Sequence, residues 1–217
     1  VGVREVVCTG PCNPPWPHSF SRWIDGKRIV REVSYEEVLQ GAEAVIEALN
    51  HANEDRTRAF ITPFVIVTSV DPSNPTSPDR LYGLNDHDLY QAKKIREIAR
   101  KYNTRIHSDA FGGMIHLAIQ DKENALLGPD VHLQHCRGIS FDEARILAET
   151  GTNVSASPGF GQVHARTPIT ELLEMGATVA ISTDGTSPST SFDMFQAMRK
   201  TQFVHQAALR DYYYLPP

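Results

Sequence analysis

Hydrophobic and polar positions follow two alternating periodicities along the chain, and these predict strands and helices in turn. Short apolar runs rich in β-branched residues predict strands at 3–10, 58–70, 105–110, 131–136, 152–157 and 178–183. Apolar residues three or four positions apart predict helices at 34–50, 85–102, 112–120, 140–150, 168–175 and 191–209. Strand–helix units repeated in this way predict an α/β fold with a parallel sheet.

Local signals support several of these boundaries. Ser34 with Glu37, and Ser140 with Glu143, have the spacing of capping boxes at helix starts. Pro63 is unfavourable inside a strand, so we expect a bulge or an irregular start there. The segment 14–23, PPWPHSFSRW, is expected to be a long loop after the first strand, either lining a substrate pocket or packing on the outside.

Two architectures can hold this alternation, an open doubly wound sheet and a (β/α)8 barrel of the TIM type. No G-x-G-x-x-G loop follows a predicted strand, so the best sign of a nucleotide-binding open sheet is missing. Potential ligands stand at successive strand ends, where (β/α)8 barrels build their active sites. We therefore expect residues 1–217 to be one catalytic barrel domain, although doubly wound sheets also carry function at strand ends.

Composition narrows the class of protein. The 217 residues are 41% hydrophobic and carry a net charge of -5, with scattered Lys and Arg, which argues against a nucleic-acid partner. No apolar run approaches the roughly 20 residues of a membrane helix. The sparse, odd cysteine set predicts no disulfide framework and a cytoplasmic location. Because the chain begins with Val1 and stops at a Pro-Pro pair, we expect it to be incomplete at both ends.

His135 and Asp184 are the first candidates for chemistry. His135 ends the strand VHLQHC, where alternation places it on one face with Val131 and Leu133, with His132 opposite as a structural residue. A histidine at a strand end can equally be a satisfied structural residue. Asp184 follows the strand TVAIST, where an aspartate can ligate a metal, hold a water, or simply cap the loop.

His107 and Asp109 share one face of the strand RIHSDA by the two-residue period, so both could ligate a metal, one could orient the other, or they could form a local hydrogen bond. If a barrel brings His107, His135 and Asp184 to one mouth, imidazole and carboxylate suit zinc, iron or manganese. Such a metal lowers the pKa of bound water. His164 and Trp16 are candidate pocket residues.

The segments VHLQHCRGISFDEARILAETGTNVSASP and VAISTDGTSPSTSFDMFQAMRK resemble the amidohydrolase superfamily, most of all its aminohydrolase and chlorohydrolase branch. The resemblance is strong over about 131 to 200 and looser elsewhere. It implies a (β/α)8 barrel whose third to eighth strands are present here. It also implies a divalent metal, most simply zinc, and a small-molecule substrate. A homo-oligomer is compatible with the sequence, which does not fix the oligomeric state.

The family's metal ligands carry over in part. Its eighth-strand Asp matches Asp184, and its sixth-strand His, which binds a second metal or contacts substrate, matches His135. Its fifth-strand His matches His107 in one register and Asp109 in another; His107 is preferred because the family's ligand there is an imidazole. The family's first-strand H-x-H pair is absent, so we expect it upstream of Val1.

Two departures from the family pattern affect the expected chemistry. The family's general acid/base Glu is replaced by Ala110 or Gly112, depending on register, and its His-Asn-Pro by 156–158, Ala-Ser-Pro, which makes Ser157 the candidate substrate contact. The resemblance implies a metal-dependent hydrolase acting on amide, amidine or similar bonds. The alternatives are an inactive relative acting as a binding or assembly module, and a peptidase-like enzyme for N-acyl amino acids or dipeptides.

Overall fold

The computed structural model describes residues 3–69, 83–158, 165–185 and 191–214. Its main element is a six-stranded parallel sheet in the order β1-β4-β5-β6-β7-β8. The strands are β1 (Glu5–Thr9), β4 (Thr57–Ile61), β5 (Ile106–Phe111), β6 (Val131–Arg137), β7 (Asn153–Ala156) and β8 (Val179–Ile181). The predicted parallel α/β sheet is thus confirmed, with each strand beside the next one in sequence. In the described part of the chain β1 and β8 are the two edge strands, so the sheet is not closed.

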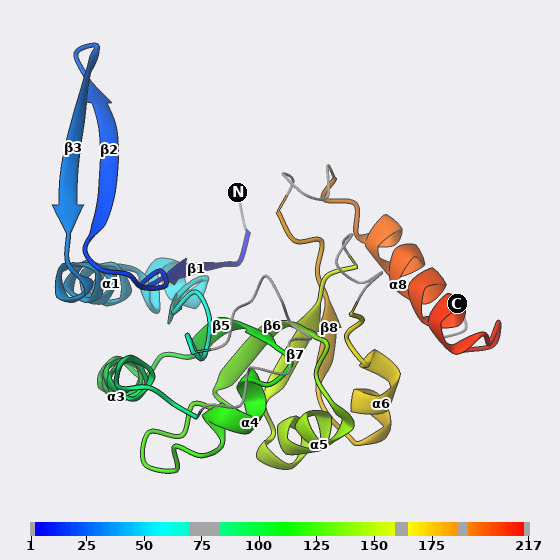
Figure 1. Cartoon of the computed structure of the whole chain (residues 1–217). Coiled ribbons are helices and arrows are strands. Elements are labelled where there is room, and N and C mark those ends of the chain that lie inside the picture. The colour runs from blue at the N-terminus through cyan, green and yellow to red at the C-terminus, as the bar shows by residue number, and fades with distance from the viewer. Residues whose placement is uncertain (1–2, 70–82, 159–164, 186–190, 215–217) are drawn as a thin grey trace.

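Helices follow the strands and lie around the sheet (Figure 1). They are α1 (Tyr35–Leu49), α2 (Ala52–Asp55), α3 (Asp86–Lys101), α4 (Met114–Ala118), α5 (Phe141–Thr150), α6 (Ile169–Glu174) and α8 (Met194–Leu209). The capping boxes predicted at Ser34 and Ser140 are confirmed. Each serine hydroxyl accepts from the backbone N–H three residues later, and the glutamate at that position accepts from the backbone N–H of the serine. No described helix is long and apolar enough to cross a membrane.

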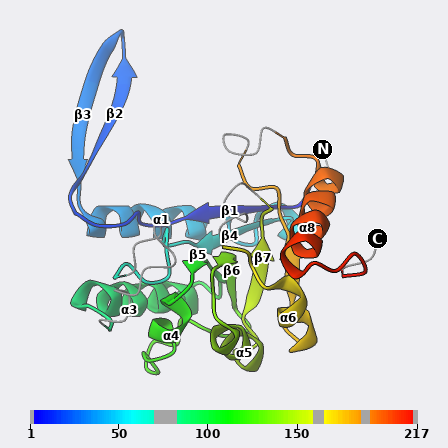
Figure 2. The same cartoon turned by 45° about the vertical axis from the view of Figure 1, so that its right-hand side comes forward.

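A β-hairpin over His18–Val33 takes the place of most of the long loop that we expected at 14–23. Strands β2 (His18–Ile24) and β3 (Lys27–Val33) pair antiparallel and project away from the sheet (Figures 1 and 2). Asp25 and Gly26, both with positive φ, make the two-residue turn between them, as such hairpin turns require. The loop prediction for 14–23 was therefore wrong from His18 onward.

The strand predicted over 58–70 is also shorter than expected. β4 ends at Ile61, and the chain then continues past Pro63 with single backbone contacts rather than a ladder. The N–H of Phe64 donates to Pro11, and Val65 forms an isolated bridge with Asp109. The irregularity expected at Pro63 is present, placed at the end of the strand, because proline cannot donate to a ladder.

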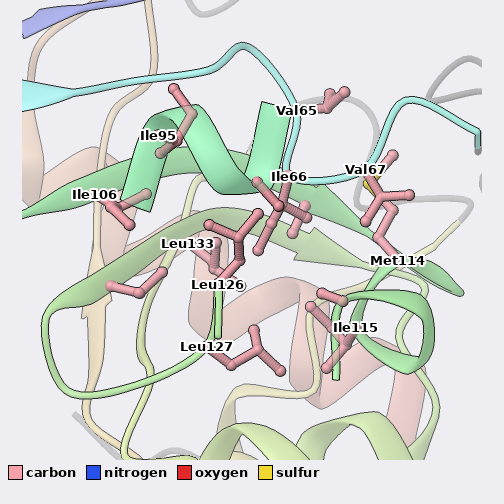
Figure 3. Close-up of a cluster of buried hydrophobic side chains, with 14 of the residues drawn as sticks. Val65, Ile66, Val67, Ile95, Ile106, Met114, Ile115, Leu126, Leu127 and Leu133 are labelled. Atoms are coloured by element: carbon pink, nitrogen blue, oxygen red, sulfur yellow. The ribbon is translucent and has the colours of Figure 1, made fainter. Parts of the chain in front are cut away.

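The hydrophobic core lies on one face of the sheet, beneath the helices. In β5 the residues Ile106, Ser108 and Ala110 are fully buried, whereas His107 and Asp109, which alternate with them, are only partly buried. Figure 3 shows buried side chains of β5 and β6 packed with those of α3, α4 and the segments after β4 and α4. One face of the sheet is therefore apolar and helix-covered, and the other carries polar groups.

Candidate active site

The polar face is most crowded where β5, β6 and β8 end. Nε2 of His135 lies 3.6 Å from Oδ2 of Asp109 and 3.9 Å from Oδ2 of Asp184. Asp109 lies within β5, His135 near the end of β6, and Asp184 three residues beyond β8. The carboxyl ends of parallel strands meet at one edge of a sheet, which explains how residues so far apart in sequence converge.

A bend in β6 directs the His135 side chain into this cluster. His135 and Cys136 both have positive φ, at 72° and 47°, so regular alternation stops there. The register between β5 and β6 also shifts after Ala110. Alternation predicted His135 on the face of Val131 and Leu133, and that prediction was wrong. Those two residues are buried under the helices, whereas His135 lies against the two carboxylates on the polar face.

Ser157 joins His135 to Asp184. Its Oγ lies 2.9 Å from Nδ1 of His135 and donates to Oδ2 of Asp184 at 3.4 Å. Gln134 donates to this hydroxyl at 3.2 Å and to that of Ser182 at 2.8 Å. Gln134 was missed from the sequence, although a polar residue between Leu133 and His135 in an otherwise buried strand was a usable signal.

Asp184 makes the local turn contact that its position suggested, and it also faces the cluster. Its Oδ1 accepts from the N–H of Gly185 at 2.6 Å, which is a local turn contact. Its Oδ2 faces His135 and Ser157. Its positive φ of 62° turns the chain at the end of the strand. One carboxylate oxygen therefore contacts the turn, and the other faces the cluster.

Burial and charge shift the ionisation of the cluster in a consistent direction. Burial, reinforced by the charge of Asp184 and opposed by Arg137, raises the pKa of Asp109 to about 7. Burial also lowers the pKa of His135 to about 4, although the nearby Asp184 charge acts in the opposite direction. Near neutral pH the cluster therefore holds an uncharged imidazole, and the charge of Asp184 disfavours ionisation of Asp109. Such a site would be stabilised by a bound cation.

His107 lies one step back along β5 and has a different partner. Its Nδ1 is 2.8 Å from Nδ1 of His132, and the two rings stack with centroids 4.8 Å apart. Burial, and then the charge of His107, lowers the pKa of His132 to about 4. The structure thus brings Asp109, and not His107, against His135. The prediction of His107 as a metal ligand stays a prediction.

The remaining residues considered from the sequence differ in where they lie relative to the cluster. Trp16 lies at the base of the hairpin, edge-on to His18 and Tyr35 with centroid distances of 4.3 and 5.4 Å, and no described contact joins it to the cluster. His164 lies outside the described residues. At the two positions considered for the acid/base Glu, Ala110 is buried, and the N–H of Gly112 donates to the carbonyl of Arg137.

The donor types suit a borderline metal such as zinc, with one imidazole and two carboxylates. The described residues nevertheless contain no group of three His, Cys, Asp or Glu side chains arranged to hold a metal ion. The donor chemistry therefore fits a metal, while the arrangement in this part of the chain falls short of a complete site.

Comparison with known sequences points to deaminases. No protein-family model matches the chain. It is 35% identical over 88 residues to a 5-methylthioadenosine/S-adenosylhomocysteine deaminase of Haloarcula marismortui, covering 40% of this chain and 20% of that protein. It is 28% identical over 145 residues to a 5'-deoxyadenosine deaminase of Methanothrix thermoacetophila, covering 61% of this chain and 34% of that protein. The chain thus spans about a third or less of the length of these curated relatives.

Solved structures with the same fold include zinc-bound hydrolases. An adenosine deaminase from Xanthomonas campestris with bound zinc matches with a TM-score of 0.64 at 16% identity, over 85% of this chain and 40% of that one. A zinc complex of atrazine chlorohydrolase from Arthrobacter aurescens matches with a TM-score of 0.62 at 17% identity, over 80% and 37%. These likenesses show a TIM-barrel-like α/β fold. The sequence likeness to deaminases and the structural likeness to zinc-bound hydrolases agree with the resemblance to the amidohydrolase superfamily.

Proposed function

We propose that this chain supplies part of the active site of a metal-dependent hydrolase that cleaves C–N bonds of small molecules. The observation that carries the proposal is the convergence of Asp109 and Asp184 on Nε2 of His135, at 3.6 and 3.9 Å. The curated relatives are deaminases. This supports a substrate in which the C–N bond between a heteroaromatic ring and its exocyclic amino group is cleaved.

A bound divalent cation such as zinc would increase the acidity of water at this position and so provide a nucleophile near neutral pH. His135 would offer Nε2, and Asp109 and Asp184 one carboxylate oxygen each. Asp184 is also the group placed to accept a proton from the attacking water, since its Oδ2 faces the centre of the cluster. Ser157, which contacts both His135 and Asp184, is the proposed substrate contact.

The incomplete ligand set supports the expectation that further ligands come from outside these residues. The family resemblance assigns an H-x-H pair to the first strand of a (β/α)8 barrel, and we propose that such a segment completes the site in the whole protein. In that arrangement the six sheet strands β1, β4, β5, β6, β7 and β8 correspond to the third to eighth barrel strands. The open edges of β1 and β8 would then be paired.

A second candidate is an inactive relative that binds rather than converts its ligand. The observation favouring it is that neither Ala110 nor Gly112 can act as the acid/base that the family resemblance places there. Asp109, with its raised pKa, is the nearest group able to give and take a proton near pH 7. Activity in the whole protein therefore requires Asp109 or a group beyond this chain to take that role.

The test is made on the full-length protein, purified and loaded with zinc. We expect close to stoichiometric metal by elemental analysis, and ammonia release from 5'-deoxyadenosine or 5-methylthioadenosine in preference to N-acyl amino acids. Asp184→Asn keeps the side-chain shape but removes the charge and the proton acceptor. It should lower kcat on the order of 10²–10⁴-fold without lowering the unfolding temperature.

Asp142→Asn is the matched control, because Asp142 is exposed on α5 and pairs only with Arg145 among the described residues. Near-normal turnover by the Asp184 variant would show that Asp184 only caps its loop. Tight ligand binding without metal or turnover would favour the inactive relative.

A further inference from the structure

A cavity of about 510 Å³ opens at the amino ends of β4, β5 and β6, whereas the candidate active site lies at the carboxyl ends of its strands. Arg58 and Phe60 of β4 line it, together with Arg105 just before β5 and Asp130 just before β6. Sites for small molecules commonly enclose about 300–1,000 Å³. The cavity is therefore large enough to hold a small ligand.

An offset between β4 and β5 explains the cavity. In the described sheet the two strands pair only through Ile61 and Ile106, so the start of β4 has no strand beside it there. The loop before β5 lies in that place, where the hydroxyl of Thr104 donates to the carbonyl of Ala59. The side chain of Asn50 accepts from the N–H of Ala59 at 3.4 Å. Strands added beyond β1 and β8 would pair at those edges and not across this gap.

The charged residues that line the cavity differ in whether they are neutralised. Arg58 pairs with Asp55, and Asp130 pairs with a buried arginine of α3. Arg100 and Arg105 are exposed, and within the described ranges neither guanidinium forms an ion pair or a hydrogen bond. The cavity therefore presents two uncompensated positive charges, in a chain whose net charge is -5.

This combination of groups suits a phosphate ester better than a neutral or singly charged ligand. A phosphate monoester carries a charge of about -1.5 to -2 near pH 7, which matches two guanidinium groups. The planar fork of arginine fits two phosphate oxygens at once. Phe60 is half-buried and adds an aromatic surface for the carbon part of such a ligand.

We propose that this cavity binds a small organic phosphate, with its phosphate group on Arg100 and Arg105 and its carbon part against Phe60. In (β/α)8 barrels the amino ends of the strands serve stability, while catalysis takes place at the other end. A ligand bound here would stabilise the folded protein by mass action. This binding does not depend on the proposed hydrolase activity.

The test is calorimetric titration of the metal-free, full-length protein, so that no bound metal can capture the anion. Phenyl phosphate combines a phosphate with an aromatic ring and should bind, whereas inorganic phosphate should bind more weakly because it cannot use Phe60. Benzoate carries a single charge and should also bind more weakly than phenyl phosphate, and uncharged benzyl alcohol should show no binding. Phenyl phosphate should raise the unfolding temperature of the wild type.

Variants locate the binding. Arg100→Gln and Arg105→Gln should each weaken the affinity for phenyl phosphate about 10–100-fold, because each removes a charge-assisted hydrogen bond to the phosphate. Both residues are exposed, so the ligand-free variants should unfold at the wild-type temperature. Arg145→Gln is the matched control, since it removes an exposed cation of α5 that pairs with Asp142 and does not line the cavity. Phe60→Leu should remove the advantage of phenyl phosphate and leave the affinity for inorganic phosphate unchanged.

Arg105→Lys provides a further check, because lysine keeps the charge but loses the planar fork. It should recover part of the affinity that Arg105→Gln loses. Failure of both phosphates to bind at millimolar concentration would overturn the proposal, as would an affinity that neither glutamine variant changes. Benzoate binding as tightly as phenyl phosphate would overturn the assignment to a phosphate.

Discussion

Replacing Asp109 with Asn should stabilise the metal-free protein, and should do so only as the pH rises. The Asp109 side chain is 23% exposed, and burial together with the charge of Asp184 raises its pKa from 3.8 to about 7. When the pKa of a carboxyl group is higher in the folded state than in the unfolded state, the folded protein favours the neutral form of that group. It destabilises the folded state once the pH is high enough for the unfolded chain to ionise.

The magnitude follows from the shift. Each unit of pKa difference is worth about 1.4 kcal/mol, so a rise of roughly three units corresponds to at most about 4 kcal/mol. The cost is absent below pH 3.8, grows between about 4 and 7, and is complete above about 7. Asparagine cannot ionise, so the stability of Asp109→Asn relative to wild type should rise across that window and stay constant above about pH 7.

The assay is urea unfolding of the metal-free wild type and variant at several pH values between 4.5 and 8. Asp142→Asn serves as control, because its exposed carboxylate should produce no such trend. With zinc bound the sign should reverse, since the variant then lacks a charged ligand. A stability difference between Asp109→Asn and wild type that is flat from pH 4.5 to 8 would refute the reasoning.

Two further predictions concern packing and capping. Leu147→Ala should lower the free energy of unfolding, measured with urea, by about 2–5 kcal/mol, because Leu147 is fully buried in α5. Leu173→Ala, on the exposed side of α6, should lower it far less. Equal losses would contradict the core assignment. Glu143→Gln should lower the free energy of unfolding by about 1–3 kcal/mol. The buried Glu143 carboxylate accepts from the N–H groups of Gly113, Ile115 and Ser140 at 2.8, 3.1 and 2.9 Å, and the single amide oxygen of glutamine cannot accept all of these bonds. Amide exchange in α4 that stays as slow as in wild type would argue against this capping role.

The local parts of the fold were predictable because their signals are local. The helix starts at Ser34 and Ser140 depend on contacts three residues apart, and the order of the strands follows from the repeated strand–helix units. The hairpin was predictable as well. Asp25-Gly26 between two alternating runs is a strong turn signal, and the loop prediction for 14–23 did not use it.

The site was predictable as a location but not in its detailed contacts. His135 and Asp184 could be placed at the right edge of the sheet from the strand ends alone. The direction of His135 depends on two positive φ angles in succession, which alternation cannot reveal for non-glycine residues. The choice between His107 and Asp109 depends on the bend in β6, because that bend decides which of them His135 meets.

The unequal faces of the sheet bear on the architecture that sequence alternation left open. A doubly wound sheet has helices on both faces, so both need apolar side chains. Here one face is apolar and helix-covered, while the other presents His107 and Asp109 on β5 and Gln134 on β6, with serines beside them. A second helix layer would bury these groups against apolar surface at considerable cost. A sheet curled with this face inward lets the polar side chains pair across strands, as Gln134 does, and leaves their far ends at a solvated mouth. The polarity of this face therefore favours the barrel over the doubly wound sheet, and it places the proposed chemistry where a barrel would use it.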